Sequence, residues 1–394
     1  MTRQCAVLLA ALFFVVACQP APQRAARPSG QSAERTLPEP AIPFAPRTYV
    51  AYRTAQPIKV DGRLDEPAWQ AAAWTEDFVD IEGSARPAPR FRTRARMLWD
   101  STNLYIAAEL AEPDVWATIT ERDAVIFRDN DFEVFIDPDG DTHQYYELEV
   151  NALGTAWDLL LGKPYRDNGH ALNGWDIHGF QVGTQVDGTL NRPGDVDRGW
   201  TVELALPWAA LGEAADTPAP PRAGDQWRIN FSRVEWRTRV EPTARSARRG
   251  EVGRYIKLTD STTGRPLPED NWVWSPQGVV NMHYPEMWGL VQFSSRVAGQ
   301  GTEAFAPRNV DAPKWMLRAV YYREQAFHAR RGVYTENLAQ LGLTAAPRPG
   351  GPWASLVGRP WPPISDVTPH GYEASLPLPA AAGRLVLTAD GAIR

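Results

Sequence analysis

The sequence predicts an all-β fold, an antiparallel two-sheet β-sandwich, followed by a small α+β region at the C-terminus. Short runs in which apolar and polar residues alternate follow one another between residues 48 and 295, and Gly, Pro, Asp and Asn turns separate them. Helical patterns are scarce in that range. After Ser295 the pattern changes, because a helix-start signal and helical spacing appear there, with two more strands behind them.

Ten segments of the first region have the alternation and composition of strands. They are residues 58–60, 92–99, 104–110, 132–136, 145–151, 155–161, 180–186, 199–206, 227–236 and 289–293. Two further segments, 66–73 and 207–211, are expected to form a turn or two of helix. Many short strands at this spacing predict a sandwich over residues 48–295.

The C-terminal region, residues 296–394, is expected to pack on the sandwich as an α+β appendage whose role stays open. Asp311 and Pro313 mark the start of a helix that Gly332 ends. Thr335 is expected to cap a second, short helix ending at Gly342. Strands at 372–378 and 384–388 close the chain.

The first 17 residues have the features of a signal peptide: Arg3 and then an apolar run, 6–16, too short to span a bilayer. The run ends in Val-Val-Ala-Cys, which resembles the lipobox of bacterial lipoproteins. This resemblance implies cleavage before Cys18 and lipidation of its thiol and amino group. Gln19 then favours the outer membrane if the cell has two. An ordinary secretory signal is the alternative.

Cysteine content and charge restrict the function further. The only cysteines are Cys5, which would leave with the signal, and Cys18, so the mature chain would have no thiol for catalysis, disulfides or metal. Residues 18–47, rich in Pro and Ala, are expected to be a disordered tether. The net charge of −6 and the dispersed arginines argue against nucleic-acid binding.

The most informative segment is residues 123–151, which reads as two strands joined by an Asp-Pro-Asp-Gly-Asp turn. Alternation places one set of side chains on a core and the other on the opposite face. That opposite face carries carboxylates, an amide and aromatic rings. Rings can cover the apolar faces of a sugar while polar groups bind its hydroxyls. A solvated sheet face is the alternative interpretation.

Five sequence blocks, in this order, resemble family 9 carbohydrate-binding modules. They are IKVDGRLDEPAW (58–69), MLWDSTNLYIAAEL (97–110), DNDFEVFIDPDGD (129–141), GWTVELALPWAAL (199–211) and WRINFSRVEW (227–236). The resemblance covers about residues 58–295. It implies a β-sandwich that grips a glycan end between two aromatic rings, has bound calcium and is often associated with xylanases.

The resemblance also implies ligand-binding residues. The two rings correspond to Phe127, where a Trp is usual, and Trp274. The polar groups correspond to Glu133 and Asn151, and Glu149 stands where the family has Arg. Because that difference changes the charge beside the ligand, sugar specificity does not carry over. Further ring candidates are Trp116, Trp157, Trp175, Trp272 and Trp288.

The turn between the two strands is a candidate calcium site. Asp137, Asp139 and Asp141 place oxygen ligands at alternate positions around Gly140, as calcium requires, and the resemblance implies bound calcium as well. The complete EF-hand pattern is absent. A plain hairpin turn, which needs no metal, is the alternative.

We therefore expect a lipid-anchored protein of the cell envelope that captures glycan or oligosaccharide ends in polysaccharide breakdown, together with degrading enzymes. A glycoside hydrolase is the first alternative, because Glu147 and Glu149 lie on one strand face at a spacing near that of glycosidase carboxylates, and Glu133 is expected on an adjacent strand. Carboxylates on one strand do not flank a bond from both sides, however, so no catalytic residue is assigned. Haem binding is the second alternative. Axial ligands must face each other across the haem, which adjacent Met282 and His283 cannot do, so His283 would pair with Met287 or a more distant residue.

Overall fold

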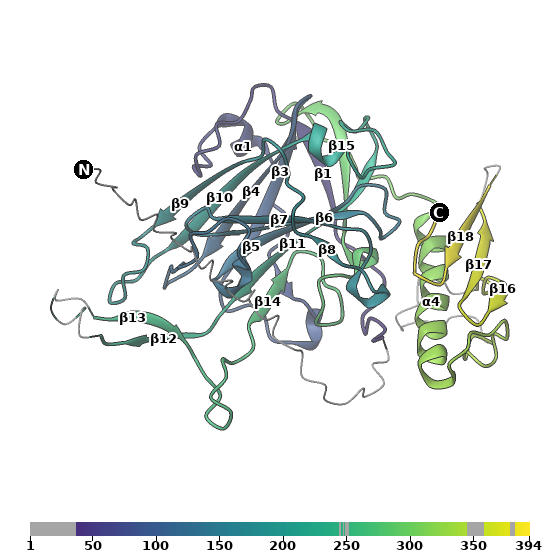
Figure 1. The fold of residues 1–394 in the computed structure, drawn as a ribbon. Coiled ribbons are helices and arrows are strands. Elements are labelled where there is room, and N and C mark those ends of the chain that lie inside the picture. Colours follow the sequence, from purple (N-terminus) through teal and green to yellow (C-terminus); the bar gives the residue numbers. More distant parts are fainter. Residues whose placement is uncertain (1–36, 244–245, 247, 249–251, 345–357, 379–382) are drawn as a thin grey trace, which may run out of the picture. The chain divides into compact units, whose positions relative to one another are not determined.

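The computed structural model describes residues 37–243, 246, 248, 252–344, 358–378 and 383–394 (Figure 1). The chain divides into two units, Met1–Arg35 and Thr36–Arg394. The predicted signal peptide, Cys18 and most of the tether lie outside the described residues. Everything below concerns the second unit.

Thirteen strands form the main sheet, in the order β8-β7-β6-β5-β11-β15-β1-β3-β4-β10-β9, with β14 paired to β11 and β2 paired to β14. All pairs are antiparallel except two, because β1 runs parallel to both β15 and β3. The strands are β1 (Thr48–Arg53), β2 (Val79–Asp80), β3 (Thr93–Trp99), β4 (Asn103–Ala111), β5 (Asp131–Asp137), β6 (Tyr145–Asn151), β7 (Ala156–Leu161), β8 (Ala171–Leu172), β9 (Gln181–Asp187), β10 (Gly199–Pro207), β11 (Gln226–Glu235), β14 (Asp270–Val273) and β15 (Gly289–Val297).

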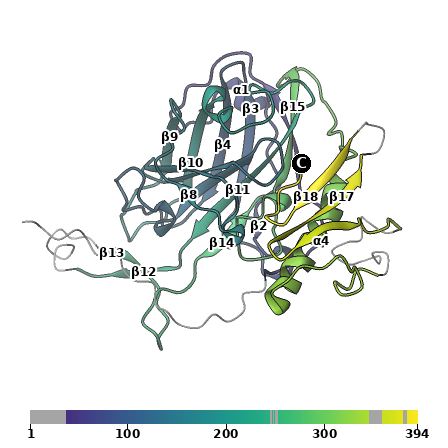
Figure 2. The same cartoon turned by 45° about the vertical axis from the view of Figure 1, so that its right-hand side comes forward.

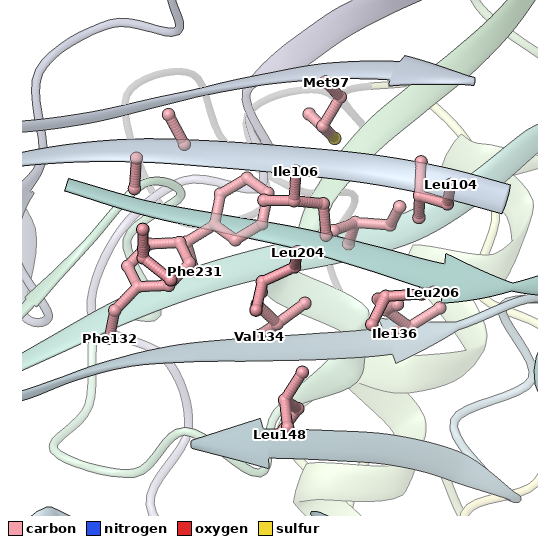
Figure 3. Packing of buried hydrophobic residues seen from close by; sticks show 14 of the residues in the cluster. Met97, Leu104, Ile106, Phe132, Val134, Ile136, Leu148, Leu204, Leu206 and Phe231 are labelled. Carbon is pink, nitrogen blue, oxygen red and sulfur yellow. The ribbon is translucent and has the colours of Figure 1, made fainter. Parts of the chain in front are cut away.

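Both flanks of this sheet contribute to one hydrophobic core (Figure 3). Ile106 of β4 and Leu204 of β10 share that core with Val134 of β5 and Leu148 of β6. The predicted mostly-β fold is confirmed. The division into two sheets stays a prediction, because the hydrogen-bonded path runs unbroken through β15, β1 and β3.

Most predicted strands are present, and the differences are local. Residues 58–60 form no strand, whereas β1 and β14 were not predicted. A two-stranded sheet, β12 (Thr238–Glu241) with β13 (Arg254–Lys257), was also not predicted. The expected helical turns are present as α1 (Pro67–Ala71) and α2 (Trp208–Leu211). Short 3-10 turns are η1 (Gly83–Ala85), η2 (Ile126–Arg128), η3 (Tyr165–Asp167) and η4 (Pro285–Met287).

The C-terminal region contains α4 (Asp311–Arg331) and a three-stranded sheet of β16 (Ile364–Thr368), β17 (Gly371–Pro377) and β18 (Arg384–Thr388) (Figure 2). Helix α4 packs against β17 and β18. Gly332 ends the helix in the left-handed conformation that favours glycine, as predicted. No helix among the described residues combines the length and apolarity needed to cross a membrane.

The predicted short helix at 335–342 is wrong. The hydroxyl of Thr335 accepts a hydrogen bond from the backbone N–H of Asn337, two residues on, which closes a turn instead of capping a helix. The described backbone over this segment consists of turns.

One hydrophobic cluster joins the C-terminal region to the segment before β15. Val279, Tyr284 and Met287 of that segment pack with Trp315 and Tyr322 of α4. The region therefore buries apolar side chains of the segment before β15, and it lies beside the loops that form the site described next.

Candidate functional site

A pocket of about 460 Å³ lies over the outer face of β5 and β6. That volume is in the range of small-molecule sites. Glu133 of β5 and Glu147 and Glu149 of β6 line it, because alternation turns these side chains away from the core. The other lining residues are Ile81, Phe127, Phe135, Trp157, Tyr165, Val234, Glu269, Asn271, Val280, Asn281, Met282 and His283.

Three aromatic rings that line the pocket remain in part accessible. Phe127, in η2, is 38% exposed, and Tyr165, in η3, is 45% exposed. Trp157 of β7 is half-buried and pairs in register with Glu149. The pocket thus combines aromatic surfaces with carboxylates, the two kinds of group that a polyol ligand needs.

The carboxylates are close together. Glu133 and Glu149 face each other across β5 and β6, and Asp131 joins them, with one oxygen of each within 4.8 Å of the others. Burial raises the pKa of Glu133 to about 7 and raises the pKa values of Asp131 and Glu149 well above their usual range. Oε2 of Glu149 accepts a hydrogen bond of 2.9 Å from the backbone N–H of Phe127.

Unlike the carboxylate of Glu149, the carboxylate of Glu147 forms no hydrogen bond with any described residue. It is only 7% exposed, and burial, with the nearby charge of Glu133, raises its pKa well above the usual range. A buried carboxylate with no partner is costly to ionise. It is therefore available to a ligand in the pocket.

His283 lines the pocket as a neutral ring. Its Nδ1 lies 2.9 Å from the hydroxyl of Tyr145, and burial lowers its pKa to about 3. The ring of Tyr165 meets it edge-on, with centroids 4.5 Å apart. None of the described residues that line the pocket is a lysine or an arginine.

The structure contradicts the prediction that Trp274 is a sugar-stacking ring. Trp274 is 0% exposed and packs in the main core against Tyr49 and Phe231. Its Nε1–H donates to Glu76, and its ring leaves no room for a Cβ at Gly289. A ring enclosed on both faces offers no surface to a ligand, so Trp274 is a core residue.

Asn151 is also a structural residue. It is 0% exposed, its amide N–H donates to Ile119 O and Asp129 Oδ2, and its Oδ1 accepts from the backbone of Leu153 and Thr155. These bonds hold the turn after β6, so the prediction that Asn151 binds a ligand is wrong. Phe127, Glu133 and Glu149 are the predicted residues that the structure brings together in the pocket.

Of the further tryptophan candidates, Trp157 lines this pocket, and Trp116 lines a different one. Trp272 and Trp288 are buried, and Trp175 stacks on Tyr146. Sequence reasoning missed Tyr165. It lies in a 3-10 turn without alternation, so no local pattern marks it.

The three aspartates of the turn do converge. One oxygen each of Asp137, Asp139 and Asp141 lies within 4.8 Å of the others. The turn already uses them, because Asp137 accepts from the backbone of Gly140 and Thr142 and Asp139 accepts from Asp141. The ammonium of Lys314 donates to the carbonyl of Gly140 at 2.8 Å.

The geometry does not favour the two alternative functions. Glu133, Glu147 and Glu149 lie on two adjacent strands of one wall, not on both sides of a bond. His283 lines the pocket, but Met287 is buried in the C-terminal cluster, and Met282 is adjacent in sequence to His283. These positions do not provide two axial ligands facing each other across a haem.

Fold and pocket together define a mostly-β protein with an acidic, aromatic-lined pocket on the outer face of its sheet. Residues 60–226 match the family described as "Carbohydrate family 9 binding domain-like". This segment contains β5, β6, β7 and all three accessible rings of the pocket. This match to residues 60–226 agrees with the resemblance that the sequence blocks indicated.

Solved structures with similarity to the chain include a putative carbohydrate-binding protein from Bacteroides uniformis ATCC 8492. It is 15% identical, with 64% of this chain and 100% of that chain covered and a TM-score of 0.44. A family 9 module from Caldicellulosiruptor kristjanssonii, solved with cellotriose and with glucose, is 15% identical, with 66% and 100% covered and a TM-score of 0.38. No curated protein matches the chain.

Proposed function

We propose that this protein binds a glycan in the pocket over β5 and β6. The observation that carries the proposal is the pocket itself, where accessible rings lie together with carboxylates, among them Glu147 without a partner in the described chain, in a region that matches a family 9 binding domain-like model. A shared domain family alone would not establish this function, because function depends on the site.

Each group of the pocket has a role in this proposal. Phe127, Trp157 and Tyr165 provide ring faces for the C–H surfaces of a sugar. Glu147 and Glu133 accept hydrogen bonds from its hydroxyls, since a carboxyl oxygen is an acceptor in either protonation state. Glu149 both lines the pocket and fixes the backbone of Phe127.

The cellular setting is part of the proposal. Lipidation of Cys18 would anchor the protein in the cell envelope, in the outer membrane of a two-membrane cell. A lipid-anchored glycan-binding protein would hold oligosaccharide ends close to the cell, near the enzymes that degrade polysaccharides. The lipobox-like Val-Val-Ala-Cys segment supports this role.

A calcium ion at the aspartate turn is the second element of the proposal. The converging oxygens of Asp137, Asp139 and Asp141 support it, because calcium prefers carboxylate and carbonyl oxygens. The ion would stiffen the hairpin between β5 and β6, and both of these strands line the pocket.

A glycan-binding screen on the purified full-length protein, with release of reducing sugar followed in the same wells, tests the main proposal. We expect retention of an oligosaccharide without hydrolysis. Phe127→Ala and Trp157→Ala should each abolish that binding with little change in melting temperature. Trp74→Ala is the matched control, because Trp74 is half-buried at a different pocket.

Two outcomes would contradict the proposal. If no glycan is retained, or if the wild-type affinity survives in both ring variants, the pocket is not a glycan site. Released reducing sugar would instead favour the glycoside hydrolase.

A further inference from the structure

The pocket is lined by acidic side chains that no basic side chain of the described lining balances. Its lining contains four carboxylates, those of Glu133, Glu147, Glu149 and Glu269, and the described lining has no lysine or arginine to balance them. The one imidazole, His283, is neutral. A pocket of this kind attracts positive charge and repels anionic ligands.

We propose that the pocket selects glycans with free, protonated amino groups, such as oligosaccharides of unacetylated glucosamine, over neutral and acidic ones. This inference rests on the proposed function and adds the chemical class of the ligand.

Glu147 is the residue that the inference depends on. It is more than nine-tenths buried, lines the pocket and lacks a protein partner among the described residues. The hydroxyl of a neutral sugar would donate one hydrogen bond to it and leave it protonated, because nothing would compensate its buried charge. An ammonium group donates three hydrogen bonds and neutralises the charge as well, which makes the bond stronger.

The aromatic lining supports the same ligand class. Phe127, Trp157 and Tyr165 line the same pocket as the carboxylates. Ring faces attract cations, and ammonium ligands are often recognised by aromatic residues combined with carboxylates. The site therefore suits a ligand whose apolar ring faces carry an ammonium substituent.

Binding of an ammonium should release protons from the protein. Burial raises the pKa of Glu133 to about 7 and the pKa of Glu147 well above its usual range, so the empty pocket holds protons that a cation displaces. The other titratable groups near these two carboxylates are Asp131, Glu149, Glu269, Tyr145, Tyr165 and His283. Arg166 lies behind His283 and is paired with Glu286.

Isothermal titration of the full-length protein with three oligosaccharides of equal length tests the inference. The probes are glucosamine trimer, N-acetylglucosamine trimer and cellotriose, at a pH where the amine is protonated. We expect the glucosamine trimer to bind about tenfold or more tightly than the other two. Titrations in two buffers of different ionisation enthalpy should show proton release only with the glucosamine trimer.

Glu147→Gln should remove most of this preference, lowering the affinity for the glucosamine trimer far more than that for cellotriose, since the amide keeps one acceptor but no charge. Glu373→Gln is the matched control, because Glu373 is exposed on β17, outside the pocket. Equal affinity for all three trimers, or an unchanged preference in Glu147→Gln, would overturn the inference and leave the proposed function intact.

A divalent cation is the competing occupant of these carboxylates. If cellotriose binding requires added calcium in the wild type, and Glu133→Gln removes that requirement, the acidic cluster holds a metal ion and the inference is wrong. If none of the trimers and no other glycan binds, the proposed function fails, and the inference fails with it.

Discussion

Arg166 and Glu286 form a buried ion pair, with Nη2 and Oε2 2.8 Å apart, between segments 120 residues apart in the sequence. Arg166 belongs to η3, next to the pocket residue Tyr165, and Glu286 belongs to η4, close behind His283. The hydroxyl of Tyr322, in α4, also donates to Glu286. Two loops of the pocket are thus tied to each other and to the C-terminal region.

Glu286→Gln should destabilise the protein by about 3–5 kcal/mol, because it removes the nearer carboxylate from the buried guanidinium of Arg166 and leaves only Asp167, whose Oδ2 lies 3.4 Å from Nε. Urea denaturation measures the free energy of unfolding. Asp187→Asn is the control, since the Asp187–Arg198 pair is exposed to solvent, and it should change that free energy by less than about 1 kcal/mol. Equal effects of the two substitutions would contradict the structural role of the buried pair.

Glu286 should also make the stability of the fold sensitive to acid. Arg166, followed by Arg318, holds the pKa of Glu286 down to about 2 against the effect of burial. A carboxyl whose pKa is lower in the folded than in the unfolded chain contributes stability above the unfolded pKa, about 4.3. That contribution should decline as the pH falls from about 5 towards 2. Denaturation midpoints across this range should fall more steeply in the wild type than in Glu286→Gln.

Trp274→Ala should lower the free energy of unfolding by about 3–5 kcal/mol, as large buried aromatic residues do, while the folded fraction still binds glycan. Phe127→Ala should show the opposite combination, with a nearly normal melt and lost binding. One thermal melt and one titration of each variant separate the two roles. A Trp274→Ala protein with a wild-type melt and no binding would restore Trp274 to the site.

Calcium removal tests the aspartate turn. EDTA should lower the melting temperature and calcium should restore it, because an ion that binds only the folded state stabilises it by about 2.7 kcal/mol at a hundredfold excess over its dissociation constant. Asp139→Asn should reduce this response, since it removes one of the three converging carboxylates. Identical melting curves with EDTA and with calcium would leave the turn as a plain hairpin.

Cys18→Ala should abolish membrane association, because the lipobox-like segment ends at Cys18 and this cysteine would carry the lipid. Fractionation of cells that express the wild type and the variant measures the effect. Recovery of the variant in the detergent-extractable membrane fraction would argue against lipidation at this residue.

The alternation of core-facing and outward-facing residues in β5 and β6 explains why the carboxylates of the pocket could be predicted from the sequence. In β5 and β6 every second residue faces the core, so the sequence alone predicted that Glu133, Glu147 and Glu149 share the opposite face. No comparable pattern in the sequence distinguishes the aromatic residues that line the pocket from those that fill the core. Trp274 and Trp157 are both tryptophans near strands, but one fills the core and the other lines the pocket.

The sequence by itself determined the mostly-β class, the segments of most strands and the C-terminal helix, because these depend on periodicity and turn residues that lie close together in the chain. Only the tertiary structure decided which rings remain accessible and which carboxylate lacks a partner. Tyr165 reaches the pocket because η3 is tied to η4 and α4, and Glu147 is unpaired because no cation from distant segments lines that wall in the described chain. Contacts between distant segments leave no periodic signal in a single sequence.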